Sequence, residues 1–126
     1  MTGEGAKAYI GGSLYGSTFL TMYYNNCYGD WAAVRKTSNN FTQTNKVYGP
    51  SFDTIRKITG TKDEVAPGTL VMKYGFNGGY CKGTVKENNI TVSIDGISVT
   101  GISSVTLTSG ESVNGDSGGP YYINLS

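Results

Sequence analysis

The feature that most constrains how this chain can fold is a glycine-rich stretch at residues 114–121, Asn-Gly-Asp-Ser-Gly-Gly-Pro-Tyr. Glycine reaches backbone dihedral angles that a Cβ forbids, so such a stretch can aim several N–H groups at one point. Ser117 lies inside this cradle, and a hydroxyl that attacks an acyl carbon needs donors for the oxyanion; Gly115 and Ser117 are the predicted oxyanion donors. The alternative is a simple turn with an incidental serine, but the full string at 115–120 favours the catalytic interpretation.

The rest of the sequence is typical of short strands joined by tight turns. It contains nineteen glycines and ten tyrosines in 126 residues, with many threonines and no pattern that requires a normal helix. Residues 90–94 alternate apolar and polar side chains, as a half-buried strand does. Turns are predicted at Asn88-Asn89 and Asp95-Gly96, the latter closing a hairpin. We therefore expect an all-β fold.

Composition excludes several functions. Ten basic residues balance nine acidic ones, which gives no reason to expect a nucleic acid or a membrane as partner. No apolar run reaches eighteen residues, and no signal peptide is visible at the start. Without histidine, and with only Cys27 and Cys81, the chain offers no metal site, and we expect no cofactor. Three glycosylation sequons, at Asn40, Asn89 and Asn124, are as frequent as chance would produce in so polar a chain.

The string at 115–120 resembles the nucleophile loop of the chymotrypsin-like serine proteases, especially the secreted bacterial branch that includes streptogrisin and α-lytic protease. Further similarity lies at residues 9–19 and in the hairpin at 73–83, so the resemblance covers about 8–122. It implies a chymotrypsin-like double antiparallel β-barrel, here incomplete, and a serine endopeptidase acting on polypeptide substrates. It also implies secretion and a monomeric state.

Asp30 begins a segment, Asp-Trp-Ala-Ala-Val, that resembles the family pattern Asp-x-Ala-x-Val/Ile. The resemblance implies that Asp30 is a buried catalytic carboxylate orienting the imidazole of a Ser-His-Asp triad. Trp31 and Val34 would then be core residues. By itself, an aspartate here has two ordinary explanations, a loop carboxylate capping nearby N–H groups or a solvated strand end.

Lys73 matches a position where relatives carry an arginine that pairs with the aspartate before the serine. A buried Asp116 would need a partner, because an unpaired carboxylate inside a protein is costly, and Lys73 is the candidate. The alternative is that both side chains are exposed and unrelated. Relatives commonly bridge the equivalents of Met72 and Cys81; here Cys81 is either free and buried or paired with another residue, such as Cys27.

The sequence has no histidine. A Ser-His-Asp mechanism needs a base whose pKa lies near neutrality, so we expect this chain alone to be inactive. Lys73 as a substitute base would compete with its pairing to Asp116. We interpret the chain as a fragment of a protease, with residues 1–50 forming the end of the first barrel and the connection, and 51–126 a truncated second barrel. The alternative is a catalytically dead, protease-like binding module. Primary specificity is not assigned, although Glu111 and Ser112 could border a pocket.

Overall fold

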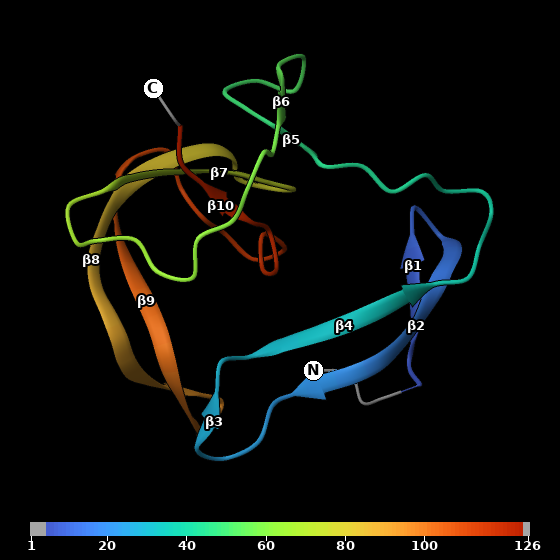
Figure 1. Ribbon diagram of the computed structural model, residues 1–126, viewed down its shortest axis with the longest axis horizontal. Coiled ribbons are helices and arrows are strands. Elements are labelled where there is room, and N and C mark those ends of the chain that lie inside the picture. Colours follow the sequence, from blue (N-terminus) through green and yellow to red (C-terminus); the bar gives the residue numbers. More distant parts are fainter. Residues whose placement is uncertain (1–4, 125–126) are drawn as a thin grey trace. The chain divides into compact units, whose positions relative to one another are not determined.

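The computed structural model describes residues 5–124, and throughout that range it contains strands, turns and loops but no helix. The all-β fold class is therefore confirmed. The strands are β1 (Lys7–Ile10), β2 (Ser13–Met22), β3 (Cys27–Tyr28), β4 (Trp31–Lys36), β5 (Lys46–Tyr48), β6 (Ile55–Lys57), β7 (Leu70–Gly75), β8 (Gly79–Ile94), β9 (Ile97–Ser109) and β10 (Tyr121–Tyr122). They are labelled in Figure 1.

The chain divides into two compact units. One contains the chain up to Thr44 together with Thr91–Ile102, and the other contains Asn45–Ile90 together with the chain from Ser103 onward. Residues Thr91–Ile102, which contain the turn between β8 and β9, therefore belong to the first unit, although the residues just before and just after them belong to the second. The expected boundary between two barrels near residue 50 stays a prediction.

The first unit contains an antiparallel sheet in the order β1-β2-β4, in which β2 is central. Its most buried side chains are Cys27 and Val99, both 0% exposed, which face each other where β3 pairs in parallel with β9. Trp31 was expected in the core but is 39% exposed. The reason is its position at the first residue of β4, where it pairs with Met22 at the last residue of β2, at the end of the sheet.

In the second unit β7 lies between β10 and β8. Its middle residues Val71, Met72 and Lys73 are all buried, as expected for a strand covered on both faces. Gly75 pairs with Gly79, so only residues 76–78 connect β7 to β8. The hairpin predicted at residues 73–83 is therefore confirmed, and it carries a short, tight loop.

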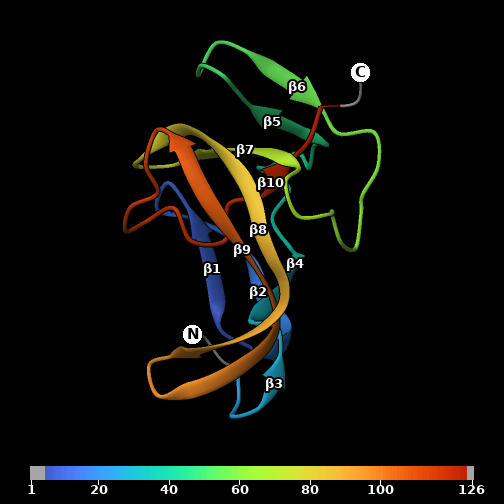
Figure 2. The ribbon, with the colours of Figure 1, turned by 90° about the vertical axis from the view of Figure 1, so that its left-hand side faces the viewer.

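Strands β8 and β9 form a long curved hairpin, seen along its length in Figure 2. Asp95 and Gly96 have φ angles of 49° and 80°, both left-handed, and they close this hairpin as predicted. The second predicted turn, at Asn88-Asn89, is wrong, because both residues lie inside β8. Asn89 has the left-handed φ of 53°, a local irregularity of the strand, while the Asn88 amide donates to Val65 O at 2.7 Å and accepts from Ser103 Oγ at 2.7 Å. These partners hold Asn88 within the strand.

Both cysteines are free thiols and buried. Cys27 belongs to the first unit and Cys81 to the second. Cys27 Sγ donates a hydrogen bond to Gly29 O at 3.1 Å, which satisfies the buried thiol. Of the two alternatives for Cys81, the structure therefore has the free, buried one.

Candidate active site

The serine loop, residues 113–119, follows β9 and consists of two successive β-turns. In the first, Asp116 N donates to Val113 O at 3.1 Å; in the second, Gly119 N donates to Asp116 O at 3.2 Å. The third position of each turn is a glycine with left-handed φ, 99° at Gly115 and 81° at Gly118. A side chain would be strained at either position, so the glycine pattern has a direct conformational cause.

Ser117 stands at the second position of the second turn, and its side chain is exposed. Within residues 5–124, the backbone N–H groups of Gly115 and Ser117 donate to no acceptor. Two donors close to an accessible hydroxyl are what an oxyanion site requires. Their role as oxyanion donors remains a prediction, and this geometry is compatible with it.

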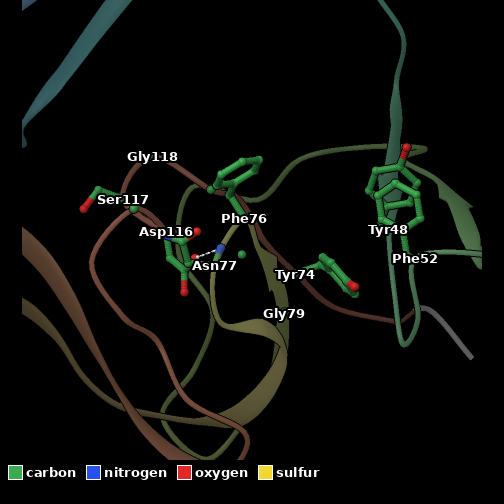
Figure 3. A pocket seen from close by; sticks show the side chains of 12 residues that line it. Tyr48, Phe52, Tyr74, Phe76, Asn77, Gly79, Asp116, Ser117 and Gly118 are labelled. Carbon is green, nitrogen blue, oxygen red and sulfur yellow. Dashed lines mark hydrogen bonds between the residues drawn. The ribbon is translucent and has the colours of Figure 1, made fainter. Parts of the chain in front are cut away.

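Asp116 fixes the serine loop to the loop between β7 and β8. Its side chain is only 3% exposed, and its carboxylate accepts backbone hydrogen bonds from Val113 N at 3.0 Å, Gly78 N at 3.1 Å and Asn77 N at 2.8 Å. These bonds favour the charged form and lower the pKa of Asp116 below its usual value. The Asn77 amide also donates to Asn114 O at 2.7 Å. Figure 3 shows Asn77 beside Asp116, joined by the backbone bond.

Lys73 is 5% exposed, and its Nζ donates to Ser112 Oγ at 3.0 Å. The direct ion pair expected with Asp116 is not formed among the described residues, because backbone N–H groups occupy the carboxylate oxygens. The lysine charge still contributes to lowering the pKa of Asp116, after the three backbone bonds. Lys73 Nζ also makes no hydrogen bond to Ser117 within this part of the chain, which weighs against a role as its base.

Asp30 lies immediately before β4 in the first unit, whereas Ser117 belongs to the second. The side chain of Asp30 is exposed, and within residues 5–124 it has no hydrogen bond or ion pair. The buried carboxylate that the resemblance implies is therefore not found here. The catalytic role of Asp30 stays a prediction.

A cavity of about 610 Å³ opens beside the serine loop. Four aromatic side chains that the sequence did not assign to the site also line this cavity: Tyr48, Phe52, Tyr74 and Phe76. Figure 3 shows these side chains with the serine loop. The spacing of Tyr74 and Phe76, two residues apart just before Asn77, could have placed them near the loop. Tyr48 is the last residue of β5 and Phe52 lies in the turn between β5 and β6, where no local sequence pattern indicates that they approach the serine loop.

In residues 5–124 no three His, Cys, Asp or Glu side chains cluster as metal ligands. Nor does this range contain a helix long and apolar enough to cross a membrane.

The fold is that of the chymotrypsin-like bacterial serine proteases, and comparison with solved structures confirms the resemblance seen in the sequence. Nocardiopsis protease matches with 28% identity and a TM-score of 0.80, over 97% of this chain and 60% of that protein. Thermobifida fusca protease A matches with 27% identity and a TM-score of 0.76, over 97% and 59%. A glutamic acid specific serine protease matches with 26% identity and a TM-score of 0.73, over 90% and 56%. The chain thus spans at most 60% of the length of these proteins. No family model and no curated protein sequence matches it.

Proposed function

We propose that this chain is the nucleophile-bearing part of a serine endopeptidase. The observation that carries the proposal is the serine loop, in which an exposed Ser117 lies beside two backbone N–H groups that have no acceptor in the described chain. The structural neighbours are serine proteases, which supports the same reaction class. Their substrates imply a polypeptide substrate here, and secretion and a monomeric state belong to the proposal as well.

In the proposed reaction, Ser117 Oγ attacks the carbonyl carbon of a peptide bond, and the N–H groups of Gly115 and Ser117 stabilise the resulting oxyanion. Asp116 contributes by position, because its three backbone bonds hold the serine loop rigid before the substrate arrives. Asp30 is the proposed orienter of the imidazole that would accept the Ser117 proton. That imidazole is not part of the 126 residues, so the chain by itself is proposed to be inert.

One neighbour is described as a glutamic acid specific serine protease that uses a histidine triad in substrate binding. This chain has no histidine, so the proposal does not extend to that mode of substrate binding.

The proposal can be tested with a fluorophosphonate probe and mass spectrometry, with and without added imidazole as an external base. We expect no stoichiometric labelling of the chain alone, and slow labelling at Ser117 when imidazole is present. Ser112 is the internal comparison, because it is exposed and bonded to the Lys73 amine. Stoichiometric labelling of Ser117 without imidazole would refute the inertness. Equal labelling of Ser112 and Ser117 with imidazole, or unchanged labelling in Ser117→Ala, would refute the role of Ser117.

The second candidate function is a protease-like module that binds polypeptides without cleaving them. The absence of histidine from the sequence favours it. Such a module should be a soluble monomer that unfolds cooperatively and binds peptides, with no labelling of Ser117 even in the presence of imidazole.

A further inference from the structure

We propose that Asn114 is a site of spontaneous deamidation, a chemical modification of the serine loop three residues before Ser117. The sequence contains two Asn-Gly dipeptides, at 77–78 and 114–115. Such a dipeptide is open to this reaction because glycine has no Cβ to hinder the approach of its nitrogen to the preceding side chain. The inference goes beyond the proposed function, since it does not require Ser117 to react.

The reaction joins the backbone nitrogen of the glycine to the side-chain carbonyl carbon of the asparagine. Hydroxide removes the N–H proton of Gly115, the nitrogen forms a bond to Asn114 Cγ, and the Cγ–Nδ2 bond breaks. The Nδ2 group takes a proton from water, which regenerates hydroxide, and leaves as ammonia. Water then opens the resulting succinimide ring, adding its OH to one of the two carbonyl carbons and a proton to the Gly115 nitrogen. Opening at Cγ gives aspartate, and opening at the main-chain carbon gives isoaspartate.

The fold protects the first dipeptide, Asn77-Gly78. Gly78 N donates to both carboxylate oxygens of Asp116, at 3.1 Å each. Loss of the Gly78 proton would break both bonds and place a second negative charge beside the first, so it is strongly disfavoured. The Asn77 side chain is held as well, because its amide donates to Asn114 O at 2.7 Å. The nucleophile and the leaving group of this dipeptide are therefore both engaged.

The second dipeptide, Asn114-Gly115, lacks these restraints. Within the described residues the Gly115 N–H donates to no acceptor, and the Asn114 side chain makes no hydrogen bond. Both residues are exposed, so water and hydroxide can reach them. A rotation that turns the Gly115 nitrogen towards Asn114 Cγ breaks the bond from the Asn77 amide to the main-chain oxygen, but no bond of the nitrogen itself. We therefore expect Asn114 to react in the folded chain while Asn77 does not.

Either product would alter the serine loop. An aspartate at position 114 places a second carboxylate two residues before Asp116, and like charges this close disfavour each other's ionised form. An isoaspartate also adds one carbon to the main chain between Val113 and Asp116. These two residues close the first β-turn of the loop through the bond from Asp116 N to Val113 O at 3.1 Å. The modification would thus loosen the segment that presents Ser117.

The test is incubation of the 126-residue chain at mildly alkaline pH, once folded and once in concentrated urea, followed by trypsin digestion and mass spectrometry. Trypsin cuts after lysine and arginine, so Asn77 falls in peptide 74–82 and Asn114 in peptide 87–126. In the folded chain we expect Asn114 to deamidate about tenfold faster than Asn77 or more, the factor associated with one hydrogen bond to a charged group. In urea the two rates should be similar. Methylation by an isoaspartyl methyltransferase should detect isoaspartate at position 114.

A variant tests the protective role of Asp116. Asp116→Ala removes the acceptor of the Gly78 N–H and should raise the deamidation rate of Asn77 about tenfold. Asp53→Ala is the matched control, because Asp53 is an exposed aspartate of the same unit, and it should leave the rate unchanged. Circular dichroism shows whether each variant is folded. If Asp116→Ala does not fold, the comparison of the folded and urea-treated unmodified chain still decides the proposal.

The proposal is overturned if Asn77 reacts as fast as Asn114 in the folded chain, or if neither reacts there while both react in urea. An equal preference for Asn114 in urea would also overturn it, because the selectivity would then not come from the fold. Deamidation of Asn114 without any isoaspartate would contradict the succinimide route. A folded Asp116→Ala with an unchanged Asn77 rate, or an equal increase in Asp53→Ala, would refute the protection by Asp116. All of these rates are independent of probe labelling at Ser117.

Discussion

Replacing Gly78 with alanine should destabilise the anchor of the serine loop by a purely steric route. The φ of Gly78 is not left-handed, so alanine costs no backbone strain there. A Cβ at this position would lie 2.5 Å from Asp116 Oδ2 and 2.7 Å from Glu111 O. Real Cβ contacts are not this short, so either the carboxylate or the main chain has to move. The carboxylate cannot rotate away freely, because it accepts three backbone hydrogen bonds, and Glu111 O belongs to the main chain.

Overpacking a well-fitted site by one methyl group costs about 1–3 kcal/mol. With roughly 4–5 °C per kcal/mol for a chain of this size, the melting temperature should fall by about 5–15 °C. Gly60→Ala is the matched control: Gly60 also lacks a left-handed φ, and a Cβ there would meet no atom within 4 Å. Its effect should stay within about 0.5 kcal/mol, or be slightly stabilising.

The measurement is urea unfolding followed by far-UV circular dichroism, together with hydrogen exchange of the Asn77 and Gly78 amides. Gly78→Ala should lower the urea midpoint and accelerate exchange at both amides, while Gly60→Ala should change neither. If the two variants had the same midpoint, the close fit of Gly78 against Asp116 and Glu111 would be refuted.

Three further outcomes are expected. In the folded chain the pKa of Asp116 is lowered from 3.8. The stability that Asp116 contributes is therefore present above pH 3.8 and is lost as the pH falls through its lower pKa in the folded state. Asp116→Asn should flatten the dependence of the urea midpoint on pH below about 4, and an unchanged dependence would contradict this. Lys73→Met should raise the pKa of Asp116 only slightly in a carboxyl NMR titration, because the backbone bonds outweigh the lysine; a return to the ordinary value would show that the lysine dominates. Val99→Ala removes two methyl groups from a fully buried site and should cost about 2 kcal/mol in urea unfolding, whereas Ile10→Val, at a half-exposed side chain, should cost under about 0.5 kcal/mol; equal losses would contradict the burial of Val99.

Local chemistry made part of the fold predictable. The Asp95-Gly96 turn follows from two residues that tolerate left-handed φ, and the strands on either side alternate in polarity. The Asn88-Asn89 turn was wrong because the same preference for left-handed φ also serves an irregularity within a strand. What decides between the two is tertiary: the Asn88 amide has partners at Val65 and Ser103, at sequence separations of 23 and 15 residues.

In the candidate site, too, some features follow from local residues and others depend on tertiary partners. The glycines around Ser117 were predictable because each turn demands one at a fixed position. The burial of Asp116 was expected from the resemblance, but its partners were not, because backbone N–H groups leave no trace in the sequence. The exposure of Trp31 likewise depends on where β4 begins relative to β2.

The β8–β9 hairpin connects the two units, because its residues are divided between them. The chain passes from one unit to the other at residues 44–45, 90–91 and 102–103. A gene segment beginning at Asn45 would encode all of β9 but not β3, whose pairing with Val99 and Thr100 covers that edge. The uncovered edge would then be open to pairing with other chains. Recombination or truncation at residues 44–45 therefore removes the edge strand of the five-stranded sheet.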